Sequence, residues 1–340
     1  MSIIVYSPDF NEFHEIANAT SVQMSYYYNG IGKLILDVPI NADNVEALKN
    51  DRILYDTVKK LAFIIKNVKT DTSKNCITAN GYTTNQILNS RVIASPVAIT
   101  NIENGVYSVV ANNLRGLTRI ALAPSKGLTE QTGITLYGEA LLDELVPVLT
   151  DAGLGNRMVW NHRSKEHTFE IYKGTDLTTG LRAVVFSDEQ GTARGLVMQD
   201  DASTFKNVAY VISEYDEKEV YEVVGTATGD DRHEMWFETS LPLEKNETEA
   251  HYRERLRNHG AMELGKKIRA MSFNVTIDPT ELGESYNIGD IVVCVSKRFG
   301  VRFNARIAGV KFTKDSRGEK TEIVLSEPNL IKLGEVILSG

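Results

Sequence analysis

The sequence has few cysteines, few prolines and no long hydrophobic run. Its 340 residues include two cysteines, Cys76 and Cys294, and both lie in strand-like segments, where cysteine usually behaves as a small buried hydrophobe. This argues against a disulfide framework and favours synthesis in a reducing cytosol. No apolar segment approaches the ~20 residues that span a bilayer, and the first residues lack the features of a secretory signal. We therefore expect no membrane span.

Positive charge is also scarce. The chain has 37 Lys and Arg against 45 Asp and Glu, for a net charge of −8, and no basic stripe interleaved with aromatic residues. The densest basic patch runs from Arg253 to Arg269, and it shares a predicted helix with Glu249, Glu254 and Glu263. That mixture is typical of a solvated, ion-paired helix face. We therefore expect no specific binding of nucleic acid.

What remains is the composition of an ordinary globular protein. Hydrophobic residues make up 42% of the chain and charged residues 24%. A length of 340 residues is too great for one ordinary core, so we expect two to four domains.

The two ends of the chain follow the same plan. Segment 51–79 and segment 290–325 each contain a strand, a longer alternating strand, a polar turn and a return strand. Ile65 and Ile307 lie 242 positions apart, as do Val68 and Val310. In both copies the alternation changes phase at Ile-x-x-Val, which predicts a bulge or sharp bend. We interpret this as a duplication that places each hairpin in its own small barrel. One continuous sheet holding both hairpins, or Ile65 and Ile307 pointing to solvent, would end this argument.

The remaining pattern predicts a β-rich α+β fold, with helices segregated between two similar β-barrels. We expect a first barrel over 1–93, an α/β domain over 94–179, a second barrel over 180–330 and a tail over 331–340. Shorter helices are expected over 81–90, 104–114 and 139–149, and a long helix over 246–269 interrupts the second barrel. Asn246 and Glu249 have the spacing of a capping box at its start.

A search for catalytic and metal-binding motifs finds no convincing site. His233-Glu234-Met235-Trp236-Phe237 begins like a zinc-protease helix, but Phe237 stands in place of the second histidine and the segment resembles a strand. His162 and His167 flank a hairpin tip without a visible third ligand. Asp200-Asp201 and Asp230-Asp231 are neighbours in turns, whereas glycoside hydrolysis needs carboxylates that face each other across a cleft. We expect no catalytic residue, cofactor site or metal site.

Several motifs, taken in order, resemble a known family. Val5-Tyr6-Ser7-Pro8-Asp9-Phe10 and Gly32-Lys33-Leu34-Ile35-Leu36-Asp37-Val38-Pro39 come first, followed by Gly81 to Ile93, Phe186-Ser187-Asp188-Glu189 with Phe205 to Ala209, and Tyr286-Asn287-Ile288-Gly289-Asp290-Ile291-Val292. Together these resemble the central tail-tip hub proteins of long-tailed bacteriophages, a group that includes tail and tail-associated proteins of siphophages.

The resemblance implies a structural protein of a virion tail tip, made and assembled in the cytoplasm of the bacterial host. Such hubs have two related barrels per subunit and form homotrimers, so that six barrels face the sixfold rings of the tail around a channel for DNA. The resemblance also implies contacts with a distal tail ring protein, a tape-measure protein and a tip fibre or receptor-binding protein. Many relatives carry a C-terminal extension, so this chain, ending at Gly340, is either a short hub or lacks a removed part.

Two other functions stay open from the residues alone. A tail-associated cell-wall hydrolase would need opposed carboxylates or a metal site in a concave pocket. A glycan-binding receptor module would need exposed aromatic residues over a groove. Tyr26-Tyr27-Tyr28 could supply them, although alternating tyrosines in a strand more often pack inside a barrel.

Overall fold

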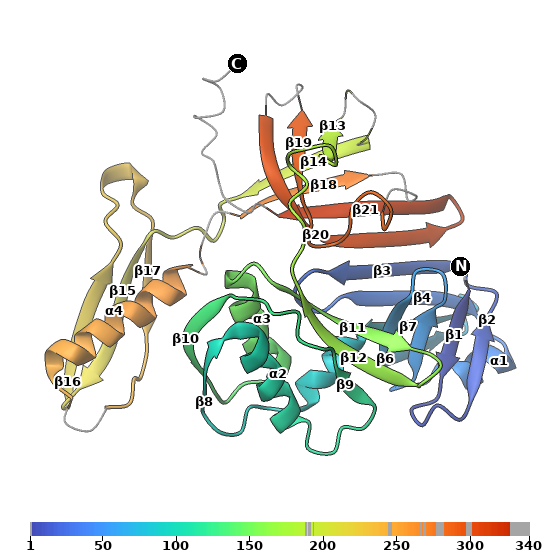
Figure 1. The fold of residues 1–340 in the computed structure, drawn as a ribbon, viewed down its shortest axis with the longest axis horizontal. Coiled ribbons are helices and arrows are strands. Elements are labelled where there is room, and N and C mark those ends of the chain that lie inside the picture. Colours follow the sequence, from blue (N-terminus) through green and yellow to red (C-terminus); the bar gives the residue numbers. More distant parts are fainter. Residues whose placement is uncertain are drawn as a thin grey trace. The chain divides into compact units, whose positions relative to one another are not determined.

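The computed structural model describes residues 2–187, 189, 192, 194–243, 247–265, 267, 270–276, 282–296 and 301–326. Two compact units are present: one contains residues 1–196 and 274–340, and the other contains residues 197–273. Strands dominate both units and helices are fewer, so the predicted β-rich α+β class is confirmed (Figure 1).

The first half of the larger unit is built from seven strands and one short helix. These are β1 (Ile3–Tyr6), β2 (Phe13–Ile16), β3 (Ser21–Tyr27), β4 (Lys33–Pro39), α1 (Ala42–Ala47), β5 (Ile53–Asp56), β6 (Leu61–Asp71) and β7 (Cys76–Thr83). The strands are ordered β3-β4-β7-β6-β5-β1-β2. Their alternating residues bury one apolar core, which includes Val22, Leu34, Phe63, Ile65 and Ala79.

The second half repeats this order with different strands. It contains β13 (Val185–Ser187), β14 (Arg194–Asp201), β18 (Ala270–Thr276), β19 (Ile291–Ser296), β20 (Val301–Asp315) and β21 (Gly318–Ser326). Their order is β14-β18-β21-β20-β19-β13, which matches β3-β4-β7-β6-β5-β1 strand for strand. One difference is that β1 runs antiparallel to β5, whereas β13 runs parallel to β19.

Both hairpins lie in one sheet, so the expectation that each has its own barrel is wrong, and by the criterion given above the hairpins do not establish a duplication. All of these strands belong to one 13-stranded sheet, joined where β20 pairs with β3 (Figure 1). The reason is the length of β20, whose 15 residues extend past β19 and reach the edge strand of the first half. The sheet is therefore continuous, and the repeat is visible in its strand order.

The predicted change of phase is a β-bulge in both copies. The pairing of β6 with β7 shifts between Ile65 and Asn67, and the pairing of β20 with β21 shifts between Ile307 and Gly309. Because a bulge inserts one extra residue, each strand bends there and changes the neighbour that it can reach on its outer edge.

Residues between the two halves form a helical layer with small sheets. Here lie η1 (Thr84–Ser90), β8 (Val97–Asn101), α2 (Ile102–Asn113), β9 (Ile120–Leu122), β10 (Gln131–Leu136), α3 (Leu141–Asp151), β11 (Gly155–Asn161) and β12 (Glu166–Tyr172). Helices α2 and α3 match the expected positions closely and share an apolar core with β11 and β12. The helix expected at 81–90 is a 3-10 helix from Thr84, because Gly81 to Thr83 still belong to β7.

The smaller unit is a three-stranded sheet with one helix. The central strand β15 (Val208–Tyr215) pairs with β16 (Lys218–Val224) on one side and β17 (Glu234–Glu238) on the other, and η2 (Gly229–Asp231) precedes β17. Tyr252 and Leu256 of α4 (Glu249–Gly265) are fully buried against Ala209 and Val211.

The start of α4 differs in part from the sequence prediction. Thr248 lies at the start of the helix, where its hydroxyl accepts a hydrogen bond from the His251 N–H at 3.3 Å. Asn246, the predicted cap, lies outside the described residues. Most of unit 197–273 follows β14 and precedes β18 in the chain, and thus takes the place of the short β3–β4 turn in the first copy.

Candidate functional site

The two hairpin histidines pack against different neighbours. His162 is exposed and stacks on Tyr55, with ring centroids 6.3 Å apart. His167 is buried, and its ring centroid lies 4.6 Å from that of Trp160 and 6.4 Å from that of Phe10. Burial alone lowers the pKa of His167 to about 4, so the ring is neutral at physiological pH. This geometry is that of a core histidine.

The two aspartate pairs remain separate features of the smaller unit's chain. Asp201 accepts a hydrogen bond from the backbone of Ser203 at 2.8 Å, as expected of a turn-forming residue. Asp230 and Asp231 lie in η2 and are exposed. Among these side chains, no described contact joins Asp201, Asp230 or Asp231 to a second carboxylate, as glycoside hydrolysis would need.

An open pocket of about 370 Å³ lies beside His233. It is lined by Ala202, Phe205, Asn207, Asp231 and His233. The Asn207 side chain bridges the pocket wall, because its amide donates to the Asp231 carbonyl at 2.7 Å and its oxygen accepts from the His233 N–H at 2.8 Å. His233 precedes β17 and its ring lies edge-on to Phe205, so the zinc-protease helix is absent from this segment.

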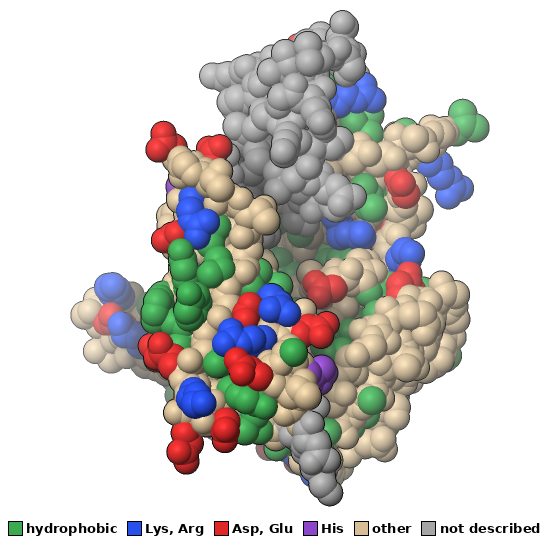
Figure 2. Space-filling model, turned by 90° about the vertical axis from the view of Figure 1, so that its left-hand side faces the viewer, with side chains coloured by type: hydrophobic (Ala, Val, Ile, Leu, Met, Phe, Trp, Pro, Cys, Tyr) green, Lys and Arg blue, Asp and Glu red, His purple; other side chains and the backbone are tan. Residues whose placement is uncertain are grey.

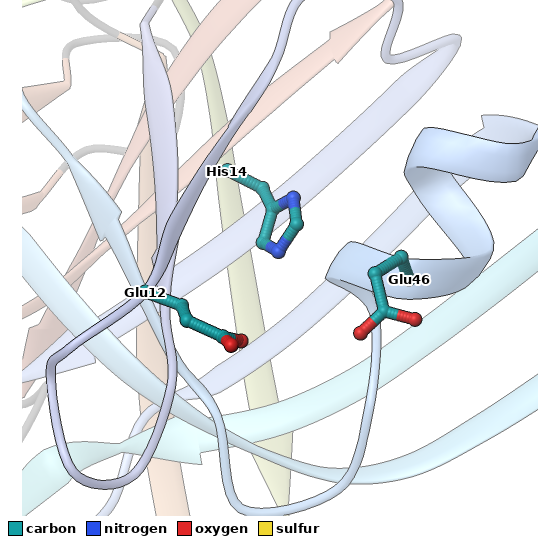
Figure 3. A group of neighbouring side chains, drawn as sticks. All are labelled: Glu12, His14 and Glu46. Atoms are coloured by element: carbon teal, nitrogen blue, oxygen red, sulfur yellow. The ribbon is translucent and has the colours of Figure 1, made fainter.

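One cluster of possible metal ligands was missed from the sequence. Glu12, His14 and Glu46 come from a loop, β2 and α1, and their ligand atoms lie within 4.8 Å of one another (Figure 3). Arg52 already balances the two carboxylates, because its Nη2 lies 3.6 Å from Glu12 and 3.4 Å from Glu46. The cluster is therefore explained by an ion-pair network.

The three tyrosines Tyr26-Tyr27-Tyr28 belong to the larger unit, and Tyr26 and Tyr27 are half-buried. Tyr28 is buried, and its hydroxyl lies 3.0 Å from the Gly153 carbonyl while accepting a hydrogen bond from the Gly174 N–H at 3.1 Å. Arg306 stacks over the Tyr28 ring at 5.0 Å. Tyr28 thus joins β3, the helical layer and the second half of the sheet.

The joint between the two halves is an antiparallel strand pair. Residues Gly309 to Lys314 of β20 pair with Tyr27 to Val22 of β3. Gly309 is required there, because a Cβ atom would overlap the Tyr27 ring. The pairing leaves Val310 fully buried. The two halves of the sheet are therefore joined by main-chain pairing between β20 and β3.

The equivalent stretch of the first copy has a free edge. Strand β6 pairs with β5 only through Leu61 to Ile64, and with β7 along its length. Past the bulge, no strand in the described part of the chain pairs with the outer edge of residues 67–71. Val68 is half-buried there, whereas its equivalent Val310 is fully buried.

A family model described as Siphovirus ReqiPepy6 Gp37-like protein matches residues 2–325. The chain belongs to this family. The resemblance to siphophage tail proteins that the sequence motifs carry is therefore confirmed. No curated protein matches the sequence at a significant level.

Solved structures of phage tail proteins share the fold of this Gp37-like protein. A tail protein from Neisseria meningitidis MC58 is 11% identical with a TM-score of 0.59, and 96% of each chain is covered. The 43 kDa tail protein of prophage MuSo2 from Shewanella oneidensis is 11% identical with a TM-score of 0.58, over 96% of this chain and 98% of that one. Prophage tail protein gp18 from Listeria monocytogenes EGD-e is 13% identical with a TM-score of 0.53, over 99% and 97%.

These findings place the Gp37-like protein among phage tail proteins with a shared fold. No helix in the described ranges is long and apolar enough to cross a membrane. Two further features were missed from the sequence, and both are strand edges. They are the β20–β3 joint and the free edge of β6. The sequence repeat marks β6 and β20 as equivalent strands, but only the structure shows that their outer edges have different partners.

Proposed function

We propose that this tail protein is the structural hub of a phage or prophage tail tip. In this proposal three copies form a closed ring around a channel that conducts DNA, and the ring adapts the threefold tip to the sixfold tail. The observation that carries the proposal is the repeated strand order of the sheet, β3-β4-β7-β6-β5-β1 and β14-β18-β21-β20-β19-β13.

The repeat supports this function through symmetry. A closed ring repeats one interface, and two similar halves in each of three subunits present six similar surfaces. Each half, 1–93 and 180–330, then forms one lobe of the subunit, with 94–179 between them in the chain and unit 197–273 inserted into the second. The two halves stay joined by the β20–β3 pair within each subunit.

The partners follow from the position of a hub. We propose contacts with a distal tail ring protein above, the tape-measure protein in the channel and a tip fibre or receptor-binding protein below. The virion tail tip is the proposed location, after assembly in the host cytoplasm. Membership of a siphovirus family supports the tail, and the repeat supports the ring.

Light scattering and electron microscopy test the hub directly. The purified chain should form a trimer at high concentration or on the purified distal tail ring, and images along its axis should show six similar lobes around a channel. A stable twofold dimer under both conditions, or a ring without a channel, would refute the proposal.

Glycan binding by the smaller unit is a second candidate function. Trp236 is 65% exposed and Tyr221 60% exposed, both on the sheet face opposite α4, with Tyr210 paired to Trp236 across the strands. Figure 2 shows the side of the molecule that lies on the left in Figure 1. Hydrophobic side chains form a band there, bordered by acidic and basic side chains. Exposed aromatic rings on an open face suit stacking against sugars.

Tryptophan fluorescence tests this candidate, because the chain has two tryptophans and Trp160 is buried. Cell-wall polysaccharide from host bacteria should quench or shift the emission of wild type but not of Trp236→Phe. A response that persists in Trp236→Phe, or no response at saturating polysaccharide, would reject it.

A further inference from the structure

The free edge of β6 has an equivalent inside the same chain that is occupied. Residues 67–71 of β6 correspond to residues 309–313 of β20, which pair with β3. In the repeated strand order, the counterpart of β3 is β14, which lies at the end of the sheet. In the described part of the chain, the β20–β3 joint is therefore occupied, the outer edge of residues 67–71 of β6 has no partner strand, and β14 is one of the two strands at which the sheet order ends.

We propose that residues 67–71 of β6 pair antiparallel with β14 of a second copy of this chain. This inference rests on the proposed ring and names its interface. A head-to-tail contact of this kind closes into a ring when the rotation between copies fits, and three copies would then alternate three β20–β3 joints with three β6–β14 joints.

Hydrogen-bond geometry shows which groups face the free edge. Ile307 exchanges backbone hydrogen bonds with Asp290 and Gly289 on the β19 side, and the Ala308 carbonyl accepts from the Tyr28 N–H on the β3 side. The backbone groups of successive strand residues point to opposite edges of the strand. Val310, two residues after Ala308, therefore also directs its N–H and carbonyl towards β3.

The same arrangement holds in the first copy. The Ile65 N–H donates to the Arg52 carbonyl at 2.9 Å and its carbonyl accepts from the Asp51 N–H at 2.7 Å. Counting past the bulge as in β20, the backbone groups of Val68 and Thr70 face the free edge, whereas those of Lys69 face β7. Val68 and Thr70 thus offer main-chain groups to a partner strand.

Side-chain burial supports a missing partner on β6. Val68 is half-buried and Thr70 exposed, whereas their equivalents Val310 and Phe312 are fully buried and half-buried beneath the β3 pairing. In a β20–β3-like orientation, Asp201 at the end of β14 would approach the start of the segment, near the exposed Lys69. Opposite charges there favour the contact modestly.

The exposed lysine admits another explanation, because lysine on an edge strand commonly prevents pairing. The second half of the sheet shows that such a lysine does not prevent pairing. Lys311, the equivalent of Lys69, is also exposed, and yet its strand pairs with β3. A lysine at this position is therefore compatible with strand addition.

The closing experiment removes one main-chain donor. Thr70→Pro deletes an N–H that faces the free edge and keeps the β7 ladder, while Thr70→Ala is the matched control that keeps the N–H. We expect Thr70→Pro to weaken trimer formation by about 100-fold and Thr70→Ala by less than about 3-fold, as measured by light scattering over a concentration series. Circular dichroism and melting of dilute samples check that both variants fold.

Hydrogen exchange on wild type supplies a readout that needs no variant. Peptides covering 66–73 should exchange slowly in the trimer and rapidly on dilution to monomer, whereas peptides covering 309–314 should stay protected in both. A trimer that is insensitive to Thr70→Pro and exchanges 66–73 rapidly would overturn the β6–β14 joint and leave the hub standing. A chain that stays monomeric at every concentration and on the distal tail ring would overturn the hub together with this joint.

Discussion

Ile65 in β6 and Ile307 in β20 occupy the same position beside a bulge. Each is fully buried, and each pairs with its partner strand immediately before the register shift. Each also donates its N–H to the segment that precedes its neighbouring strand, to Arg52 at 2.9 Å and to Asp290 at 2.8 Å. The equivalence between the two halves therefore extends to the backbone hydrogen bonds of single residues.

Truncating either isoleucine should destabilise the larger unit. We expect Ile65→Ala and Ile307→Ala each to lower the free energy of unfolding by about 2–5 kcal/mol, because both leave a cavity in a packed core. Urea unfolding followed by circular dichroism measures this. Val58→Ala, at a position that is 65% exposed, is the control and should change stability by less than about 0.5 kcal/mol. Equal effects of all three changes would contradict the packing described for both halves.

Gly289 and Tyr28 supply a second test of how the halves are joined. Gly289 has φ +100, and a Cβ atom there would overlap the Tyr28 ring. Gly283 has a similar φ of +94 with open space around it. Both alanine variants should carry backbone strain of about 1 kcal/mol, and Gly289→Ala should lose roughly 1–3 kcal/mol more through overpacking. Thermal unfolding compares them, and equal losses would show that the Tyr28 contact does not constrain the joint.

Much of the fold could be predicted because its signals are local. The alternation of β3 and β4, the stripe of α3 and the Asn41 cap of α1, which accepts from the Asn44 N–H at 2.8 Å, depend on residues close in sequence. The bulges were predicted from a change of phase within a single strand. Small strands such as β9, which has three residues, were not predicted because their alternation is too short.

The continuous sheet could not be predicted, because it depends on a contact between distant segments. Nothing in the β3 sequence indicates that Tyr27 will lie beside Gly309. The same holds for the Glu12, His14 and Glu46 cluster, whose members come together only through the packing of α1 beside β2. The free edge of β6 also became visible only when the two copies could be compared strand by strand.

His167 predicts a specific dependence of stability on pH. Its pKa is about 4 in the folded chain because burial disfavours the charged ring, and about 6.5 when the chain is unfolded. Between these values the unfolded state binds the extra proton, so stability is fully present above about pH 6.5 and falls as the pH drops towards 4. The contribution of this one group amounts to roughly 3 kcal/mol over that window.

Two variants isolate this contribution. His167→Leu should show a flatter fall in unfolding free energy between pH 6.5 and 4 than wild type, whereas the exposed His162→Gln should follow the wild-type curve. Urea unfolding at closely spaced pH values measures the difference. Parallel curves for wild type and His167→Leu would show that the ring is not held neutral in the folded state.

The last prediction is that the isolated chain neither hydrolyses peptidoglycan nor binds DNA tightly. No described contact joins Asp201, Asp230 or Asp231 to a second carboxylate, and the His233 segment leads into a strand instead of a zinc-binding helix. A net charge of −8 disfavours phosphate contacts, whose affinity comes from Lys and Arg neutralising the backbone. A channel that conducts DNA also needs weak contacts, because each tight contact would slow passage. Zymography on peptidoglycan and a DNA shift assay at about 50 mM salt should both be negative. Lysis that persists through purification, and disappears when Asp200, Asp201, Asp230 or Asp231 is changed to Ala, would instead favour the tail-associated hydrolase.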